Sequence, residues 1–269
     1  MANIVQLVCL TVIGGLGYLL IKRYPRKLQI SDCVLIPLFT GVKMILALLS
    51  LNLPLFGFPS LRVGISQLPL MIGGVILGPV PAFMLGIVVD VVGLLVTPTD
   101  YPFLGFTLGN ILTAVLPALV TAKFKDAKNP TRVLYGLLLG IGLINLLTIF
   151  FVKEIKFSAD VIIELNNLTR FSLLAIISVC LLLVVAIYRV VISRIKENDY
   201  RYAVWFTGVI LVEFIVNVIL TPVWLQIMYG IPFFASSALR IIKATLLINV
   251  EGALGYAVLV LLAKVRKKH

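Results

Sequence analysis

The chain has few charged residues, few cysteines and a single histidine. Only 13% of its 269 residues are charged, 61% are hydrophobic, and the mean hydropathy is +1.14. A soluble domain of this length could not hide so much apolar surface in its core. Cys9, Cys33 and Cys180 all fall within apolar segments, so neither a disulfide framework nor a Cys-x-x-Cys metal pair is expected.

Groups for enzyme chemistry are also scarce. The histidine is His269, the last residue, and no His-Glu-x-x-His, Gly-x-Ser-x-Gly or nucleotide phosphate-loop motif occurs. We therefore expect no enzyme activity, no catalytic residue, no metal and no cofactor. If the protein drives transport with ATP, another subunit must hydrolyse it.

Long apolar segments recur along the whole chain. A spanning helix needs about 20 mostly apolar residues, so this pattern predicts an all-α polytopic membrane protein. Nine spans are predicted, at Ile4–Ile21, Leu28–Leu51, Val63–Gly78, Val80–Val96, Phe106–Ala122, Val133–Val152, Leu168–Ile192, Tyr202–Met228 and Ala235–Ala263.

The net charge of +12 is explained by orientation in a membrane. Sixteen of the 23 Lys and Arg residues form four clusters of four, at positions 22–27, 123–132, 189–201 and 264–268. Basic residues of this kind mark cytoplasmic segments, which predicts an N-terminus outside and a cytoplasmic C-terminus. The first span lacks a preceding basic flank and a cleavage site, so we expect an anchoring helix. No nucleic-acid partner is indicated.

Six ionisable residues fall within the predicted spans, where each needs a partner or a use. One interpretation is mutual neutralisation, for example of Lys43 by Asp90 or Glu251. A second is an anion-binding pocket. The six residues are Lys43, Asp90, Glu213, Arg240, Lys243 and Glu251.

Polar residues line one face of each of the last two spans, and helical periodicity predicts which residues share a face. These stripes should face protein or a cavity, because a lipid-facing polar stripe would be costly. On the last span the stripe is Arg240, Lys243, Leu247 and Glu251, and on the preceding one it is Glu213, Asn217, Thr221 and Trp224.

Three predicted outer loops are rich in proline, glycine and aromatic residues: Asn52–Arg62, Thr97–Gly105 and Gln226–Phe234. In the predicted orientation all three open to the same side. They would form a lid over a pocket, although interfacial anchoring of single aromatic residues is the alternative.

Several short motifs resemble one known family. They are Gly78-Pro79 before the Gly-spaced helix that bears Asp90, Gly105-Phe106-Thr107-Leu108 after a proline-rich loop, Thr221-Pro222-Val223-Trp224-Leu225, Tyr229-Gly230, and Arg240-Ile241-Ile242-Lys243. This pattern, under half of the chain, resembles the substrate-binding S components of energy-coupling factor (ECF) vitamin transporters, most closely their folate branch.

The resemblance implies a six-helix core with two additions. Residues 1–27 would be an extra N-terminal transmembrane helix, 28–130 core helices 1–4, 131–195 an inserted transmembrane hairpin, and 196–269 core helices 5–6. The protein would sit in a bacterial plasma membrane and bind a vitamin from outside. A transmembrane coupling protein and two cytoplasmic ATPases would then help to release it inside.

For folate, the resemblance and the stripes together predict ten binding residues. Cationic side chains would pair with anionic or pterin groups, aromatic rings would flank the ligand, and polar groups would supply hydrogen bonds. The ten are Arg62, Asp90, Phe106, Thr107, Asn217, Thr221, Trp224, Tyr229, Arg240 and Lys243.

The chain also departs from the family pattern. The small-residue docking surface of the first core helix would read Cys33, Pro37 and Gly41, and Thr221-Pro222 replaces an expected Asn-Thr pair. Pantothenate therefore stays open as a substrate. A solitary ion-coupled transporter using Asp90, Glu213 or Glu251, or an intramembrane enzyme, is a further alternative.

Overall fold

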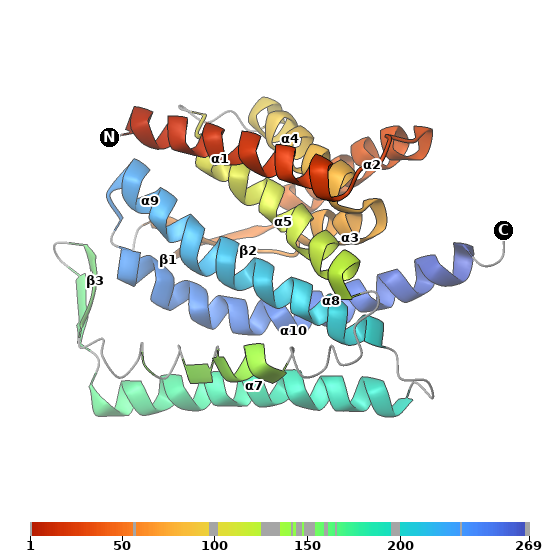
Figure 1. Cartoon of the computed structure of the whole chain (residues 1–269). Coiled ribbons are helices and arrows are strands. Elements are labelled where there is room, and N and C mark those ends of the chain that lie inside the picture. The colour runs from red at the N-terminus through yellow and green to blue at the C-terminus, as the bar shows by residue number, and fades with distance from the viewer. Residues whose placement is uncertain are drawn as a thin grey trace.

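The computed structural model is a bundle of long helices with two short β hairpins (Figure 1). The helices are α1 (Ala2–Arg23), α2 (Ile30–Leu48), α3 (Leu68–Leu77), α4 (Pro79–Val96), α5 (Leu104–Phe124), α7 (Asn167–Arg194), α8 (Tyr200–Leu211), the π-helix η1 (Val212–Leu220), α9 (Thr221–Tyr229) and α10 (Phe233–Arg266). The structure describes residues 2–55, 58–96, 102–124, 135–140, 142–143, 147, 154–158, 161–164, 166–194, 200–231 and 233–266.

Six described helical segments are long and apolar enough to cross a membrane. Their lengths of 18 to 29 residues correspond to about 27 to 44 Å of helix, against a hydrocarbon core of about 30 Å. A helical multi-pass membrane architecture is therefore confirmed. The six segments are Asn3–Arg23, Ile30–Leu48, Pro79–Val96, Leu104–Phe124, Arg201–Tyr229 and Lys243–Lys264.

The predicted span Val63–Gly78 is shorter than expected. Its helix, α3, has ten residues and reaches only about 15 Å. Pro69 lies in its first turn, where proline is tolerated. The helix ends at Gly78, whose φ of 86° favours glycine. Pro79 then starts α4, because a first-turn residue needs no amide donor.

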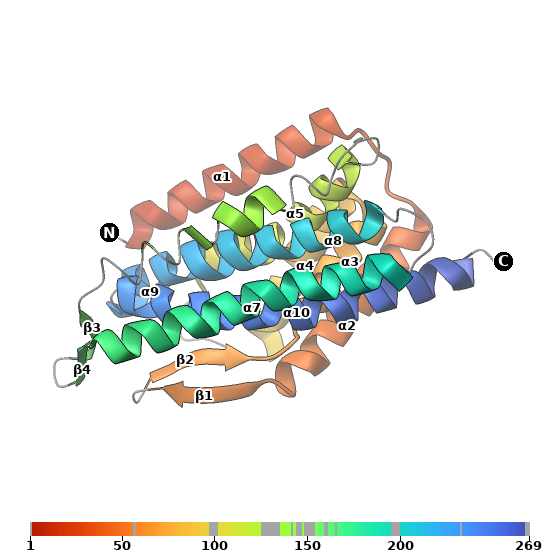
Figure 2. The ribbon, with the colours of Figure 1, turned by 90° about the horizontal axis from the view of Figure 1, so that it is seen from below.

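The predicted loop Asn52–Arg62 is a β hairpin. Strands β1 (Leu51–Leu55) and β2 (Phe58–Val63) are antiparallel, and β2 contacts α10 (Figure 2). Strands β3 (Glu154–Ser158) and β4 (Val161–Glu164) form the second hairpin, before α7. Outside the described part of the chain lie residues 131–134, 141, 144–146, 148–153, 159–160, 165 and 195 of the predicted insertion, which include much of the predicted span Val133–Val152, and residues 97–101 of the predicted loop Thr97–Gly105. Nine spans and the four-part division therefore stay predictions.

The two ends of the bundle differ in charge. The N-terminus, the α9–α10 connection and the β3–β4 hairpin lie at one end (Figure 1). The opposite end holds the α1–α2 connection and the last turns of α10, which carry Lys22, Arg23, Arg26 and Lys264. These basic clusters therefore share one end, although the side of a membrane that this end faces stays a prediction.

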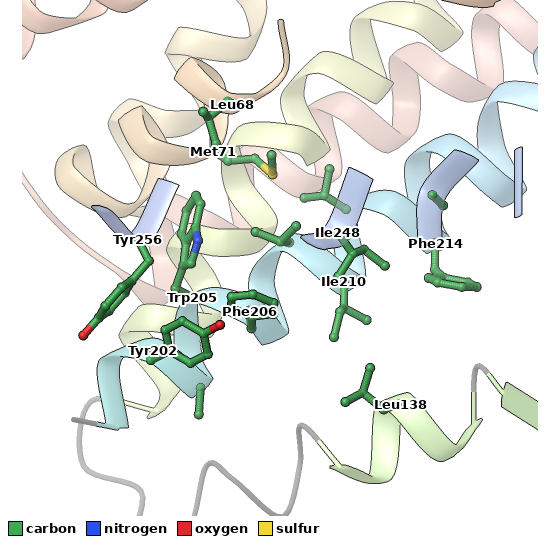
Figure 3. Close-up of a cluster of buried hydrophobic side chains, with 14 of the residues drawn as sticks. Leu68, Met71, Leu138, Tyr202, Trp205, Phe206, Ile210, Phe214, Ile248 and Tyr256 are labelled. Carbon is green, nitrogen blue, oxygen red and sulfur yellow. The ribbon is translucent and has the colours of Figure 1, made fainter. Parts of the chain in front are cut away.

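The largest hydrophobic cluster joins α3, α8, η1 and α10 (Figure 3). Tyr202 stacks at a tilt on Phe206, with ring centroids 4.4 Å apart. Trp205 donates an indole hydrogen bond of 2.9 Å to the carbonyl of Gly252 on α10. A Cβ at Gly252 would collide with the ring of Phe206, so glycine lets the helices approach closely. This contact fixes the last two membrane helices against each other.

Helix α5 packs against α3 and α4, and glycines lie at both contacts. A Cβ at Gly74 of α3 would collide with the carbonyl of Ala114, and one at Gly86 of α4 would collide with the backbone of Ile111. Because both obstacles are backbone atoms, no rotamer change relieves them. These glycines therefore set the distance between α5 and its neighbours.

We expect Gly86→Ala to destabilise the protein by about 1–3 kcal/mol, the usual cost of overpacking a tight core. Gly41→Ala is the matched control, because a Cβ at Gly41 of α2 would meet no atom within 4 Å. Thermal unfolding of the detergent-solubilised protein measures both. Equal melting temperatures for the two variants would contradict the close α4–α5 packing.

Candidate functional site

A polar cavity of about 320 Å³ lies between α5, the η1–α9 segment, α10 and the chain that follows β2. It opens within the membrane-spanning bundle, where a polar lining facing lipid would be unfavourable. Its lining consists of Gly64, Ser66, Gln67, Gly105, Phe106, Gly109, Asn110, Thr113, Val216, Asn217, Thr221, Trp224, Arg240, Lys243, Leu247 and Glu251.

Six of the ten predicted binding residues line this cavity: Phe106, Asn217, Thr221, Trp224, Arg240 and Lys243. Asp90 and Thr107 contact each other outside the lining. Tyr229 ends α9 and is 62% exposed. Arg62 belongs to β2, and its side chain lies outside the described part of the structure. Ligand binding by any of the ten stays a prediction.

The predicted stripe on the last helix faces the cavity. Arg240, Lys243, Leu247 and Glu251 all contribute to its lining, as spacings of three and four residues require on one helical face. The Arg240 Nε donates a 3.2 Å hydrogen bond to the hydroxyl of Ser236, one turn earlier. Helix α10 thus carries two cations and one carboxyl group along a single wall.

A π-helix shapes the opposite wall. Pro222 has no amide hydrogen, so it cannot bond the carbonyl of Val218 four residues earlier. Ser237 of α10 donates its hydroxyl to that carbonyl at 3.3 Å. The Thr221 hydroxyl bonds the carbonyl of Val216, five residues earlier, at 2.7 Å. The wider turn thereby links η1 to α10 and satisfies its own carbonyls.

Asn217 is occupied by protein partners. Its side-chain amide and that of Gln67 exchange two hydrogen bonds, each 3.0 Å long. Asn217 Nδ2 also donates to Glu213 Oε1 at 2.8 Å. Both N–H groups and the oxygen of Asn217 are therefore used, so this residue positions Gln67 and Glu213 around the cavity.

Two carboxyl groups lie behind and along the cavity. The side chains of Glu213 and Glu251 are within hydrogen-bonding reach of each other, and both residues are 0% exposed. Lys243 and Arg240 act electrostatically on Glu213, and Lys243 also acts on Glu251. Among the described residues no third metal-binding side chain joins the pair.

Two aromatic rings of the lining, Phe106 and Trp224, pack against Phe103. Phe103 packs edge to face against Trp224, with ring centroids 5.6 Å apart, and against Phe106 at 5.9 Å. Gln6 of α1 accepts a hydrogen bond from the Leu104 amide and donates one to the Pro102 carbonyl. The N-terminal helix α1 therefore holds the segment that places Phe103.

Asp90 joins α4 to α5. Its carboxylate accepts hydrogen bonds from the Thr107 hydroxyl at 2.7 Å and from Asn110 Nδ2 at 2.9 Å. Both of its oxygens are thus engaged by α5, and Asn110 in turn lines the cavity. In this structure Asp90 and Thr107 position the wall, and neither forms part of it.

The ten predicted site residues omit six polar residues of this region: Ser66, Gln67, Asn110, Thr113, Glu213 and Glu251. Each is a polar residue inside an apolar segment, and this was the available signal. For Glu213 and Glu251 the stripes had predicted the correct face. For Gln67, Asn110 and Thr113 nothing in the sequence indicated which helix they would meet.

Comparisons with protein-family models, with curated proteins and with solved structures found no match. The cavity is therefore the feature of this protein that bears on its function.

We expect Asp90→Ala and Thr107→Val each to destabilise the protein, Asp90→Ala more, because hydrogen bonds to charged groups contribute about 1.5–3 kcal/mol. The double variant should lose less than the sum, since the residues share one interaction. Unfolding of all four proteins in detergent gives the coupling. Strict additivity would show that the pair does not hold α4 to α5.

Proposed function

We propose that this protein is the membrane-embedded vitamin-binding subunit of an ECF-type importer, with folate as its substrate. The carrying observation is a polar cavity within a membrane-spanning bundle, with Arg240 and Lys243 on one wall. The protein would capture the vitamin from outside. A coupling protein and two ATPases would drive its release inside.

The size and lining of the cavity support a small organic acid as ligand. Its volume of about 320 Å³ lies at the lower end of small-molecule sites. Arg240 and Lys243 suit carboxylates, which form strong charge-assisted hydrogen bonds with cations. Phe106 and Trp224 provide faces for a flat ring. These features favour a ligand with both an aromatic ring and a carboxylate. Folate has both groups, whereas pantothenate has a carboxylate but no aromatic ring.

The distribution of charge supports the orientation of the cavity. The basic end of the bundle would face the cytoplasm, which places the N-terminus outside. Phe103 and the α9–α10 connection then lie toward the exterior. In this scheme α1 steadies the outer segment around Pro102, and residues 131–195 are an insertion outside the vitamin-binding core.

Folate should raise the melting temperature of the purified protein, and pantothenate should raise it less, because tight binding stabilises the folded state by mass action. Arg240→Gln and Lys243→Gln should each weaken folate binding by about 10- to 100-fold, the effect of losing one charge-assisted hydrogen bond. Lys264→Gln, on the exposed basic end of α10, is the matched control and should bind normally. Binding of neither vitamin would sink the proposal.

Transport should require partner subunits, since the chain has no phosphate-loop motif. Proteoliposomes that contain this protein alone should bind labelled folate without accumulating it under a proton or sodium gradient. Accumulation driven by such a gradient would instead identify a solitary secondary transporter. Reconstitution with a coupling protein and two ATPases should then make uptake depend on ATP.

A further inference from the structure

Glu251 is a buried carboxyl group whose hydrogen-bonding capacity is unmet. It is 0% exposed and lines the cavity, and no donor among the described residues reaches either of its oxygens. A buried carboxylate without donors is strongly unfavourable. Its oxygens therefore need a proton shared with a neighbouring carboxyl group, a donor from outside the described residues, or both.

Glu213 can satisfy only part of the hydrogen-bonding capacity of Glu251. One of its oxygens accepts from Asn217, and the other, Oε2, has no donor among the described residues. A proton shared between the two carboxyl groups would satisfy one oxygen on each side. One oxygen of Glu251 still has no donor. A ligand in the cavity can supply N–H groups to this site.

Trp224 has a buried hydrogen-bond donor without an acceptor among the described residues. Its indole Nε1–H is buried, and no acceptor among the described residues reaches it, although the residue is only 8% exposed and lines the cavity. Buried indole N–H groups usually have a partner. The cavity therefore offers a ligand one unused donor as well as unused carboxyl oxygens.

The charged residues of the cavity are spread along α10, with Lys243 between Arg240 and Glu251 and close enough to act electrostatically on both carboxyl groups. Arg240 and Glu251 are eleven residues apart, which corresponds to about 16 Å of helix. Lys243 follows Arg240 within one turn, and Glu213 lies beside Glu251. One end of the wall thus favours anionic groups, and the other favours hydrogen-bond donors.

The geometry points to a ligand that binds in one orientation: a flat ring with an amidine-like N–H edge on Glu251, and a carboxylate at Arg240 and Lys243. This inference rests on the proposed function and deepens it. It names the edge of the vitamin that the site reads, as in the 2-amino-4-oxopyrimidine ring of folate. The proton shared with Glu213 leaves the carboxyl pair one negative charge, so an N–H group of this edge would form a charge-assisted hydrogen bond to the remaining oxygen of Glu251.

The test compares folate with 2-desamino-2-methylfolate, which keeps the carboxylates and replaces the amino donor by a methyl group. Dissociation constants are measured by isothermal titration for the wild-type protein and for Glu251→Gln, which keeps the shape of the side chain. Glu251→Leu is the second variant, and size-exclusion profiles check that each protein is folded. Thr113→Val is the matched lining control, because the Thr113 hydroxyl already donates to the Gly109 carbonyl at 2.8 Å.

We expect Glu251→Gln and Glu251→Leu to weaken folate binding by about 10- to 100-fold, the size of a lost hydrogen bond to a charged group. Both variants should affect the desamino analogue much less, while Thr113→Val should affect both ligands equally. Equal losses for the two ligands in the Glu251 variants, or no loss for either, would overturn the inference. So would binding of pantothenate without folate, although the importer would then stand. A wild-type protein that binds no vitamin would overturn the proposed function itself.

Discussion

Polar side chains inside a membrane-spanning bundle have no bulk water to satisfy them, and this constraint organises the structure. Asp90 is satisfied by Thr107 and Asn110, and Gln67 by Asn217. Each pairing joins two segments that apolar contacts alone would leave free to slide or rotate. Burying these polar groups unpaired would be energetically costly. The hydrogen bonds therefore select one register of the helices against each other, and the cavity wall depends on that register.

Close approach between helices complements these pairings. Glycines at the contacts of α5 with α3 and α4, and of α10 with α8, remove the Cβ atoms that would separate the backbones. Helix α5 is therefore tightly packed against α3 and α4, and α10 against α8. The cavity lies between α5, the η1–α9 segment and α10. The Thr221-Pro222 step contributes to this space, since the π-helix displaces the backbone and leaves the Val218 carbonyl for Ser237. The π-helix and the first turn of α9 thus form one wall of the cavity, through Val216, Asn217, Thr221 and Trp224.

The cavity is more balanced in charge than a simple anion site. Arg240 and Lys243 face the same space as Glu251, with Glu213 immediately behind it. The two carboxyl groups offset the charge of the two cations, fully if both are ionised and in part if they share a proton. In the proposed function, selectivity would come from where each charge lies along α10, which would favour an elongated ligand with unlike ends over a compact anion. This is the physical basis for preferring a ring-and-carboxylate vitamin.

The sequence by itself determined the membrane class and the composition of the polar faces. Long apolar segments require a bilayer, and a period of 3.6 residues places Arg240, Lys243, Leu247 and Glu251 together whatever surrounds them. Only the tertiary structure decided which polar groups satisfy each other. The Gln67–Asn217 pair spans 150 positions, and Asp90 turned toward α5. Such choices depend on the rotation and register of one helix against another, which no local periodicity encodes.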